Sequence, residues 1–189
     1  MTWDSVQISE ISDKDYKSIY SLLSPSRRAR VDAQKCIDAQ KRTLAGEFLV
    51  RRIIKDKYGI ENPVITVSDN GKPVLNCPLY FSISHSDSTV VCAVDTAPVG
   101  IDIEKIRPVK RELIERVCTK SELSYVSGKA DIETLCKDHD ILKRFFEIWC
   151  IKEAYYKKLG AGVKSFKDIN TLTLKKQIIS MDNFVICII

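Results

Sequence analysis

The chain has 189 residues, of which 44% are hydrophobic and 29% charged, and its formal net charge is +5. This composition is typical of a globular protein with one domain or two small packed lobes, and it excludes a largely disordered chain. No apolar run reaches bilayer length and the start lacks a secretion signal, so we expect a cytoplasmic protein that does not enter a membrane. The positive excess suits an anionic small molecule or an acidic protein, whereas the dispersed basic residues disfavour nucleic acid as a partner.

The seven cysteines form no CxxC pair and no spacing typical of a metal site. Several lie in apolar runs such as "VVCAV" and "FVICII", which is typical of small core residues. We therefore expect reduced thiols, as in a cytosolic protein, and no disulfide framework.

The first third of the chain predicts helices. Residues 13–23 show a short amphipathic pattern that ends at Ser24-Pro25. Residues 26–58 show one long helical pattern, and Gly59 is placed to end it.

The middle of the chain predicts short strands. "VITVS" is the first, and Asn70-Gly71 in "DNGKPVL" indicates a turn after it. "LYFSIS" and "TVVCAVD" are strand-like, and the polar "HSDS" between them indicates a hairpin or a tight loop. "VGIDIE" predicts a further strand, followed by a helical pattern from 109 to 117 or beyond.

The last third predicts one strong helix and two strands. Residues 127–140 are polar and of mixed charge, so we expect them to be exposed. A helical pattern covers 141–159 and is closed by "GAG", and the tail segments "INTLTLK" and "NFVICII" are strand-like. The mixture of elements predicts an α/β or α+β class, of which we expect an α+β, sandwich-like arrangement.

The strand "VGIDIE" places two acids on one side. Side chains two apart on a strand point to one face, so Ile101 and Ile103 can enter a core while Asp102 and Glu104 project together to the other side. Two carboxylates at such a short separation repel each other, and each raises the pKa of the other unless a cation lies between them. An acidic pair of this kind is more often a solvated face, but its spacing also suits a bound cation.

The helix "FFEIWCIKEAYYKKLGAG" adds further charges. Lys152 and Glu153 interrupt its apolar surface, and Lys157 follows Glu153 at the i+4 spacing of an ordinary surface salt bridge. Together with Asp102 and Glu104, however, Glu153 supplies a third hard oxygen ligand for Mg²⁺. Lys152 and Lys157 would add positive charge of the kind that phosphoryl chemistry requires.

Other polar residues have an ordinary and a functional interpretation. His85 in "SISHSDS" suits a hydrogen-bonded loop residue, and Lys72 in "NGKP" suits an exposed turn lysine. Arg27, Arg28 and Arg30 in "SPSRRARV" suit a solvated helix start, although such a cluster can also grip a phosphate through forked donors.

Taken in order, "GKP", "FSISHS", "VGIDIE" and "WCIKEAYYK" resemble the motifs of the Sfp-type 4′-phosphopantetheinyl transferases of the holo-acyl-carrier-protein synthase superfamily. A G-x-D-x-E strand and a W-x-x-K-E-A-x-x-K helix are specific when they occur together. "SPSRRAR" and "KRTLAGEFLVRRII" extend the resemblance to roughly residues 22–166, and the segment after 166 is shorter than is usual in the family.

The resemblance implies two similar lobes related by a pseudo-twofold, here 1–99 and a short second lobe 100–189, with coenzyme A in the cleft between them. It implies transfer of the 4′-phosphopantetheine arm of coenzyme A to a serine of an apo carrier protein, with release of adenosine 3′,5′-bisphosphate. Acyl, peptidyl and aryl carriers of fatty-acid, polyketide or nonribosomal peptide synthesis all remain open. We expect a monomer.

The resemblance also assigns roles at the reacting phosphates. Asp102, Glu104 and Glu153 are expected to hold Mg²⁺, or Mn²⁺, against the pyrophosphate of coenzyme A. Lys152 and Lys157 match positions of the motif helix, and Lys157 is the better candidate for reaching those phosphates. Glu153, or a water that it orients, is the candidate base for the serine proton, and its role as base or as metal ligand stays open.

A further set of residues is implied to contact the nucleotide. Arg27 and Arg30 match positions that grip the 3′-phosphate, and the other expected contacts are Thr43, Lys72, Ser84, His85 and, against the adenine, Pro73. The carrier is expected near 108–123, and its acidic surface suits the positive net charge.

Two alternatives remain. One is a degenerate relative that binds coenzyme A without catalysis, although the intact acid trio and Lys157 disfavour it. The other is a different Mg²⁺-dependent phosphoester enzyme, for which the sequence offers no P-loop or other independent motif.

Overall fold

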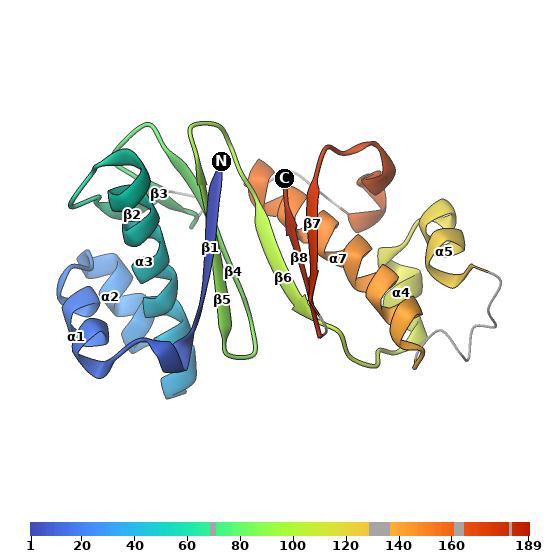
Figure 1. The fold of residues 1–189 in the computed structure, drawn as a ribbon, viewed down its shortest axis with the longest axis horizontal. Coiled ribbons are helices and arrows are strands. Elements are labelled where there is room, and N and C mark those ends of the chain that lie inside the picture. The colour runs from blue at the N-terminus through green and yellow to red at the C-terminus, as the bar shows by residue number, and fades with distance from the viewer. Residues whose placement is uncertain (69–70, 129–136, 161–164, 182) are drawn as a thin grey trace. The chain divides into compact units, whose positions relative to one another are not determined.

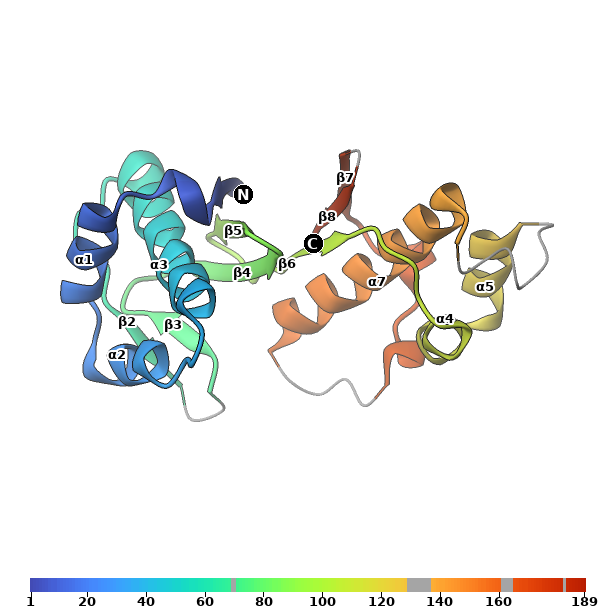
Figure 2. The same ribbon diagram turned by 90° about the horizontal axis from the view of Figure 1, so that it is seen from below.

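The computed structural model describes residues 1–68, 71–128, 137–160, 165–181 and 183–189 (Figures 1 and 2). The chain divides into two compact units, unit 1 over Met1–Val99 and unit 2 over Gly100–Ile189. Both mix helices with antiparallel sheet, which confirms the α+β class. The twofold relation between lobes stays a prediction. Within the described ranges, no helix is long and apolar enough to cross a membrane.

Unit 1 contains a three-stranded sheet in the order β1-β5-β4 and a two-stranded sheet of β2 and β3, all antiparallel. The expected hairpin around "HSDS" is confirmed, but its turn is tight, because His85 and Ser86 still pair with Val90 and Thr89. Asp87 in the turn has a φ of 51°, a left-handed conformation that aspartate tolerates. The strands are β1 (Thr2–Gln7), β2 (Ile65–Val67), β3 (Pro73–Leu75), β4 (Tyr80–Ser86) and β5 (Thr89–Asp95).

The long helix expected over 26–58 is two helices. Residues 33–36 interrupt it, and Cys36 is extended, with φ −106° and ψ 132°. Because the chain turns there, α2 packs back on α3 and buries Arg27 against Glu47, which one continuous helix would prevent. Gly59 ends α3 in the left-handed conformation, as expected. The helices of unit 1 are the 3₁₀ turn Ile8–Glu10, α1 (Asp13–Ser21), α2 (Pro25–Asp32) and α3 (Ile37–Tyr58).

The core of unit 1 lies between α3 and one face of the larger sheet, an arrangement visible in Figure 2. Strand β5 contributes every second residue, Val90, Cys92 and Val94, and α3 contributes Leu49 and Ile54, all fully buried. Burial of these side chains, about 1.5–3 kcal/mol for each large aliphatic one, holds α3 on the sheet.

Unit 2 has a three-stranded antiparallel sheet in the order β6-β8-β7, with the long helix α7 packed on one face (Figure 1). Phe145, Phe146 and Ile151 of α7 pack with Val185 and Cys187 of β8 in a single core. The elements are β6 (Ile101–Lys105), α4 (Arg111–Val117), α5 (Lys120–Ser127), α7 (His139–Leu159), two 3₁₀ turns (Phe166–Asp168 and Thr171–Thr173), β7 (Gln177–Met181) and β8 (Phe184–Ile188).

One expected strand of unit 2 is absent from its predicted place. The segment "INTLTLK" forms a 3₁₀ turn, because the amide and hydroxyl of Thr171 both donate to the buried carboxylate of Glu122. The strand of this region, β7, begins later, at Gln177. The Asn70 turn, most of the polar stretch 127–140 and the end of "GAG" lie outside the described residues.

Candidate functional site

The two acids of β6 lie on the face of the sheet that α7 covers. Asp102 is paired with Cys187 and Glu104 with Val185, and these two partners belong to the core beneath α7. Asp102 is therefore buried, with an exposed fraction of 3%, while Glu104 is partly exposed. As expected, Asp102 and Glu104 lie on the opposite face of the strand from Ile101 and Ile103. This face is covered by α7 and is not fully open to solvent.

Gly100 allows this helix to approach the strand closely. A Cβ atom at this position would lie 1.8 Å from the carbonyl oxygen of Ala154 and 2.9 Å from the backbone nitrogen of Lys158. Only glycine fits such a contact, since real Cβ atoms do not come that near a backbone oxygen. Gly100, the first residue of the G-x-D-x-E motif, therefore brings Glu153 and Lys157 close to the acids of β6.

Lys157 makes an ion pair across from the helix to the strand. Its Nζ lies 2.7 Å from Oδ1 of Asp102, with exposed side-chain fractions of 27% and 5%. The ordinary interpretation of the sequence paired Lys157 with Glu153 along one helix face. In the structure, Lys157 donates a hydrogen bond to Asp102 of the strand. The pair leaves one end of the cluster accessible to solvent.

The carboxylates of the cluster influence one another. Burial and the charge of Asp102 raise the pKa of Glu153, while the ammonium of Lys157 lowers it. Burial and Asp102 likewise raise the pKa of Glu104, against the guanidinium of Arg107 at 3.2 Å, which lowers it. Three acids from two segments distant in sequence thus share one electrostatic environment.

The chemistry of this cluster suits a divalent cation. Carboxylate oxygens are the ligands that Mg²⁺ prefers, and a cation would relieve the repulsion that raises the pKa of Glu104 and Glu153. In the described part of the chain, no three acid, histidine or cysteine side chains are close enough together to hold a metal ion. The ammonium of Lys157 neutralises Asp102 here, and the closing of all three acids around one ion stays a prediction.

Lys152, next to Glu153 on α7, lies in a different environment. It is fully buried, and its ammonium donates to the Val117 carbonyl at 2.8 Å, to Glu122 Oε2 at 2.6 Å and to the Phe166 carbonyl at 2.8 Å. An ammonium group has three protons, so no donor remains for a phosphate. This placement favours a structural role over the predicted contact with coenzyme A.

The residues that hold Lys152 were missed. Glu122 lies on α5, a separate helix where the sequence predicted only one helical pattern from 109 to 117 or beyond, and Thr171 lies in the turn that was expected to be a strand. The signal for α5 is the capping box in "TKSE", where Thr119 and Glu122 satisfy each other's backbone amides.

Comparison with known proteins covers both units. A family model described as "4'-phosphopantetheinyl transferase superfamily" matches residues 98–184, which include the acid cluster, and one described as "4'-phosphopantetheinyl transferase, N-terminal" matches residues 10–97. The chain is 33% identical to the 4′-phosphopantetheinyl transferase psf-1 of Bacillus pumilus, over 84% of this chain and 69% of that protein. It belongs to the 4′-phosphopantetheinyl transferase family.

Two other transferases of this family are similarly related. The Sfp protein of Bacillus subtilis (strain 168) is 34% identical over 81% of this chain and 67% of its own length. The gsp protein of Aneurinibacillus migulanus is 36% identical over 71% of this chain, which spans about half of that relative, 54% of its length.

In this transferase, two of the residues expected at the nucleotide line a pocket of unit 1. The pocket has a volume of about 320 Å³, and Lys72 and Pro73 border it together with Leu75 and Phe81. Burial lowers the pKa of Lys72, which is the effect of taking a cation partly out of water.

The other expected nucleotide contacts of unit 1 are more dispersed. Arg27 is buried, with Nε donating to Glu47 at 2.6 Å, whereas Arg30 is exposed. Thr43 donates its hydroxyl to the Ala39 carbonyl of its own helix at 3.1 Å. Ser84 is buried and its neighbour His85 exposed, so their side chains point to opposite faces of β4. Their contacts with the nucleotide stay predictions.

Proposed function

We propose that this chain transfers the 4′-phosphopantetheine arm of coenzyme A to a serine hydroxyl of an acidic apo carrier protein, in a Mg²⁺-dependent reaction that releases adenosine 3′,5′-bisphosphate. The observation that supports this role in a chain of the family is the cluster of Asp102, Glu104 and Glu153 beside Lys157. The free state of the described cysteines suits a reducing cytoplasm, which is where we place the reaction.

Asp102, Glu104 and Glu153 are the residues that would hold Mg²⁺. The bound ion supplies charge neutralisation at the pyrophosphate of coenzyme A. Without an ion the three carboxylates repel, so the cluster has a physical reason to bind one.

Lys157 is held beside the acids by its ion pair with Asp102. Its side chain is partly exposed, unlike that of Lys152, so a phosphate oxygen can approach it from the solvent side. A cation held in this way stabilises the negative charge that develops on the leaving phosphate as the pyrophosphate splits.

Glu153 is the base in this proposal. Burial is the larger cause that raises its pKa above the ordinary value of 4.5, and unlike the repulsion by Asp102 it would not be relieved by a bound ion, so the carboxylate stays a strengthened proton acceptor. It removes the proton of the carrier serine, directly or through a water that it orients, while the hydroxyl attacks the phosphorus atom.

The pocket beside Lys72 is the proposed place of the adenine nucleotide. Its apolar walls, Pro73, Leu75 and Phe81, suit a flat base, and the partly buried ammonium of Lys72 suits a phosphate. A few polar groups at the edge of an apolar pocket are the usual composition of a small-molecule site.

The carrier is proposed to dock around 108–123, which includes α4. Lys110 and Arg116 are exposed there, and the positive net charge of the chain favours attraction of an acidic partner over distance.

The test is to mix the protein with coenzyme A, Mg²⁺ and several apo carriers, and to weigh each carrier by mass spectrometry. A mass gain of one phosphopantetheine arm on a serine is expected for at least one carrier, and no gain when Mg²⁺ is removed. Folded protein that binds coenzyme A but modifies no carrier would point to a degenerate binding protein. Consumption of coenzyme A without any carrier would point to a hydrolase.

A further inference from the structure

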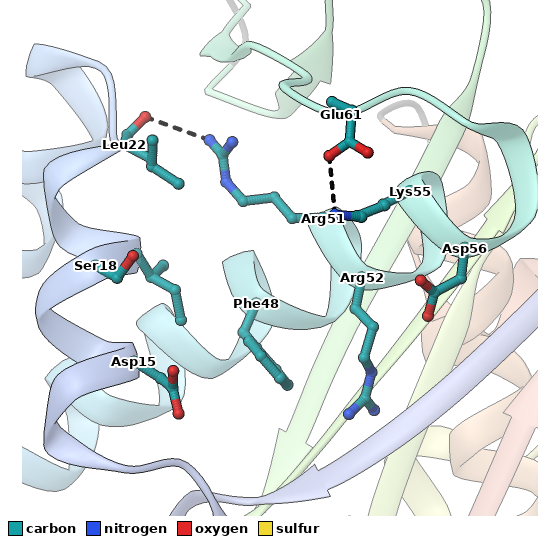
Figure 3. Close-up of a pocket in the computed structure, with 10 residues that line it drawn as sticks. Asp15, Ser18, Leu22, Phe48, Arg51, Arg52, Lys55, Asp56 and Glu61 are labelled. Carbon is teal, nitrogen blue, oxygen red and sulfur yellow. Dashed lines mark hydrogen bonds and ion pairs between the residues drawn. The ribbon is translucent and has the colours of Figure 1, made fainter.

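A second pocket of unit 1 lies between helices α1 and α3 and has a volume of about 330 Å³ (Figure 3). Its apolar lining comes from Ile19, Leu22 and Phe48, and three cations border it, Arg51, Arg52 and Lys55. None of the residues assigned to the transfer reaction lines it. Its volume falls at the lower end of the range of roughly 300–1,000 Å³ for small-molecule sites.

Arg51 is the cation of this pocket with the weakest protein partners. Its side chain has an exposed fraction of 14%, and its Nη2 donates to the Leu22 carbonyl over a long 3.3 Å, the contact drawn in Figure 3. Its buried Nε finds no hydrogen-bond acceptor among the described residues, and Oε2 of Glu47 lies 3.8 Å away, beyond hydrogen-bond range. Burial lowers the pKa of Arg51 and the charge of Glu47 raises it, and burial is the larger of the two influences.

The reason lies beneath the pocket, where two guanidinium groups share one carboxylate. Glu47 has an exposed side-chain fraction of 1%; its Oε1 accepts from Arg27 Nε at 2.6 Å, while its Oε2, which accepts no hydrogen bond from the described residues, lies 3.8 Å from Arg51 Nε, too far to satisfy either group. The trio therefore has an excess positive charge in a poorly hydrated place. An anion reaching Arg51 would balance it.

The other two cations have firm partners. Arg52 is paired with Asp4, and its guanidinium lies 4.9 Å above the ring of Phe48. Lys55 is paired with Glu61 at 2.9 Å. A ligand therefore finds an unsatisfied charge at Arg51 and an apolar surface next to it.

We propose that this pocket binds a small monocarboxylate with an apolar body, its carboxylate on Arg51 and its body against Phe48, Ile19 and Leu22. The planar fork of a guanidinium matches the two oxygens of a carboxylate. A phosphate monoester, with a second negative charge, is disfavoured because Asp15, Asp56 and Glu61 border the same pocket.

The test is a titration of the full ¹⁵N-labelled chain with octanoate below its micelle concentration, followed by amide shifts in two-dimensional NMR. Saturable shifts are expected in α1 and α3. Octanamide, with the same body and no charge, is expected to bind about tenfold more weakly, and octyl phosphate also more weakly than octanoate. Absence of saturable shifts in these helices, or equal binding of octanamide, would overturn the proposal.

Three variants locate the site. Arg51→Gln is expected to weaken octanoate binding about tenfold, while Lys57→Gln, an equal charge change on an exposed part of the same helix, leaves it unchanged. Ser18→Trp fills the pocket from an exposed position of α1 and should abolish binding without altering any charge, even where Arg51→Gln disturbs Glu47. Octanoate binding that Ser18→Trp leaves intact would place the ligand elsewhere. Neither result depends on carrier modification.

Discussion

Two lysines five residues apart on α7 each bond a carboxylate, yet they form opposite kinds of cluster. The Lys152 pair is sealed: Glu122 accepts from Lys152 and the Thr119 amide through Oε2, and from Thr171 through Oε1. The Lys157 pair is partly open, and two further acids raise the negative charge around it. A neutral, saturated cluster has nothing left to bind, whereas an open cluster with excess charge can accept a ligand.

The largest expected effect is at the open cluster. Glu153→Gln keeps the shape of the side chain but removes its charge, and should lower carrier modification by about 10²- to 10⁴-fold because the proton acceptor is lost. The rate is measured by mass spectrometry under saturating coenzyme A. Glu147→Gln, on the same helix outside the cluster, is the control, and near-normal turnover of Glu153→Gln would remove Glu153 from the mechanism.

At the sealed cluster the expected loss is of stability. Lys152→Met leaves the charge of Glu122 buried without its partner, and should reduce the free energy of unfolding by about 3–5 kcal/mol in urea denaturation. Arg111→Met breaks an exposed ion pair and should change it by less than about 1 kcal/mol. The double variant Lys152→Met/Glu122→Leu should recover much of the loss. A small effect of Lys152→Met alone would contradict the structural role.

The contact that joins strand and helix can be tested next. Gly100→Ala introduces a Cβ into the backbone of α7 and should lower the free energy of unfolding by about 1–3 kcal/mol, as overpacking does. It should also reduce carrier modification at temperatures where the variant is folded, because α7 must move away from β6. A stable variant of full activity would mean that this close approach does not set the site.

The smallest expected effect is a shift in the pKa of Glu153. Lys157 lowers the pKa of Glu153, so Lys157→Met should raise that pKa further above its ordinary value. A carboxyl with a raised pKa binds its proton more tightly in the folded state, so the variant should gain stability on acidification from a higher pH than the parent. Carbon-detected NMR titration of Glu153 measures this, and an unchanged pKa would separate Lys157 from the cluster.

The sequence was informative where a local pattern decided the structure. Alternation in "VGIDIE" and helical periodicity before "GAG" correctly located β6 and α7, and with them the three acids. The sequence was uninformative where contacts with a segment distant in sequence determined the local structure. Strand β1 exists because it pairs with β5, and the turn at Thr171 exists because Glu122 accepts its hydrogen bonds.

The difference between Lys152 and Lys157 could not be read locally. Lys152 and Lys157 flank Glu153 on one amphipathic helix, and both are positive. Lys152 is buried because α5 and the turn at Phe166 supply acceptors around it, and the sequence did not predict that either segment would pack against Lys152. The sequence identified the charged residues of the site, but it could not predict which of them would be buried by segments remote in sequence. This second question was the main limit on predicting the site.

Because the main chain of α7 rests directly against Gly100, the separation between Glu153 and the acids of β6 is set in part by a backbone contact, which substitutions of the surrounding aliphatic side chains leave in place. Neutral drift among those aliphatic residues should therefore erode thermal tolerance long before it alters turnover. Laboratory evolution can exploit this order, recruiting stabilising replacements in the aliphatic core while Gly100 is retained.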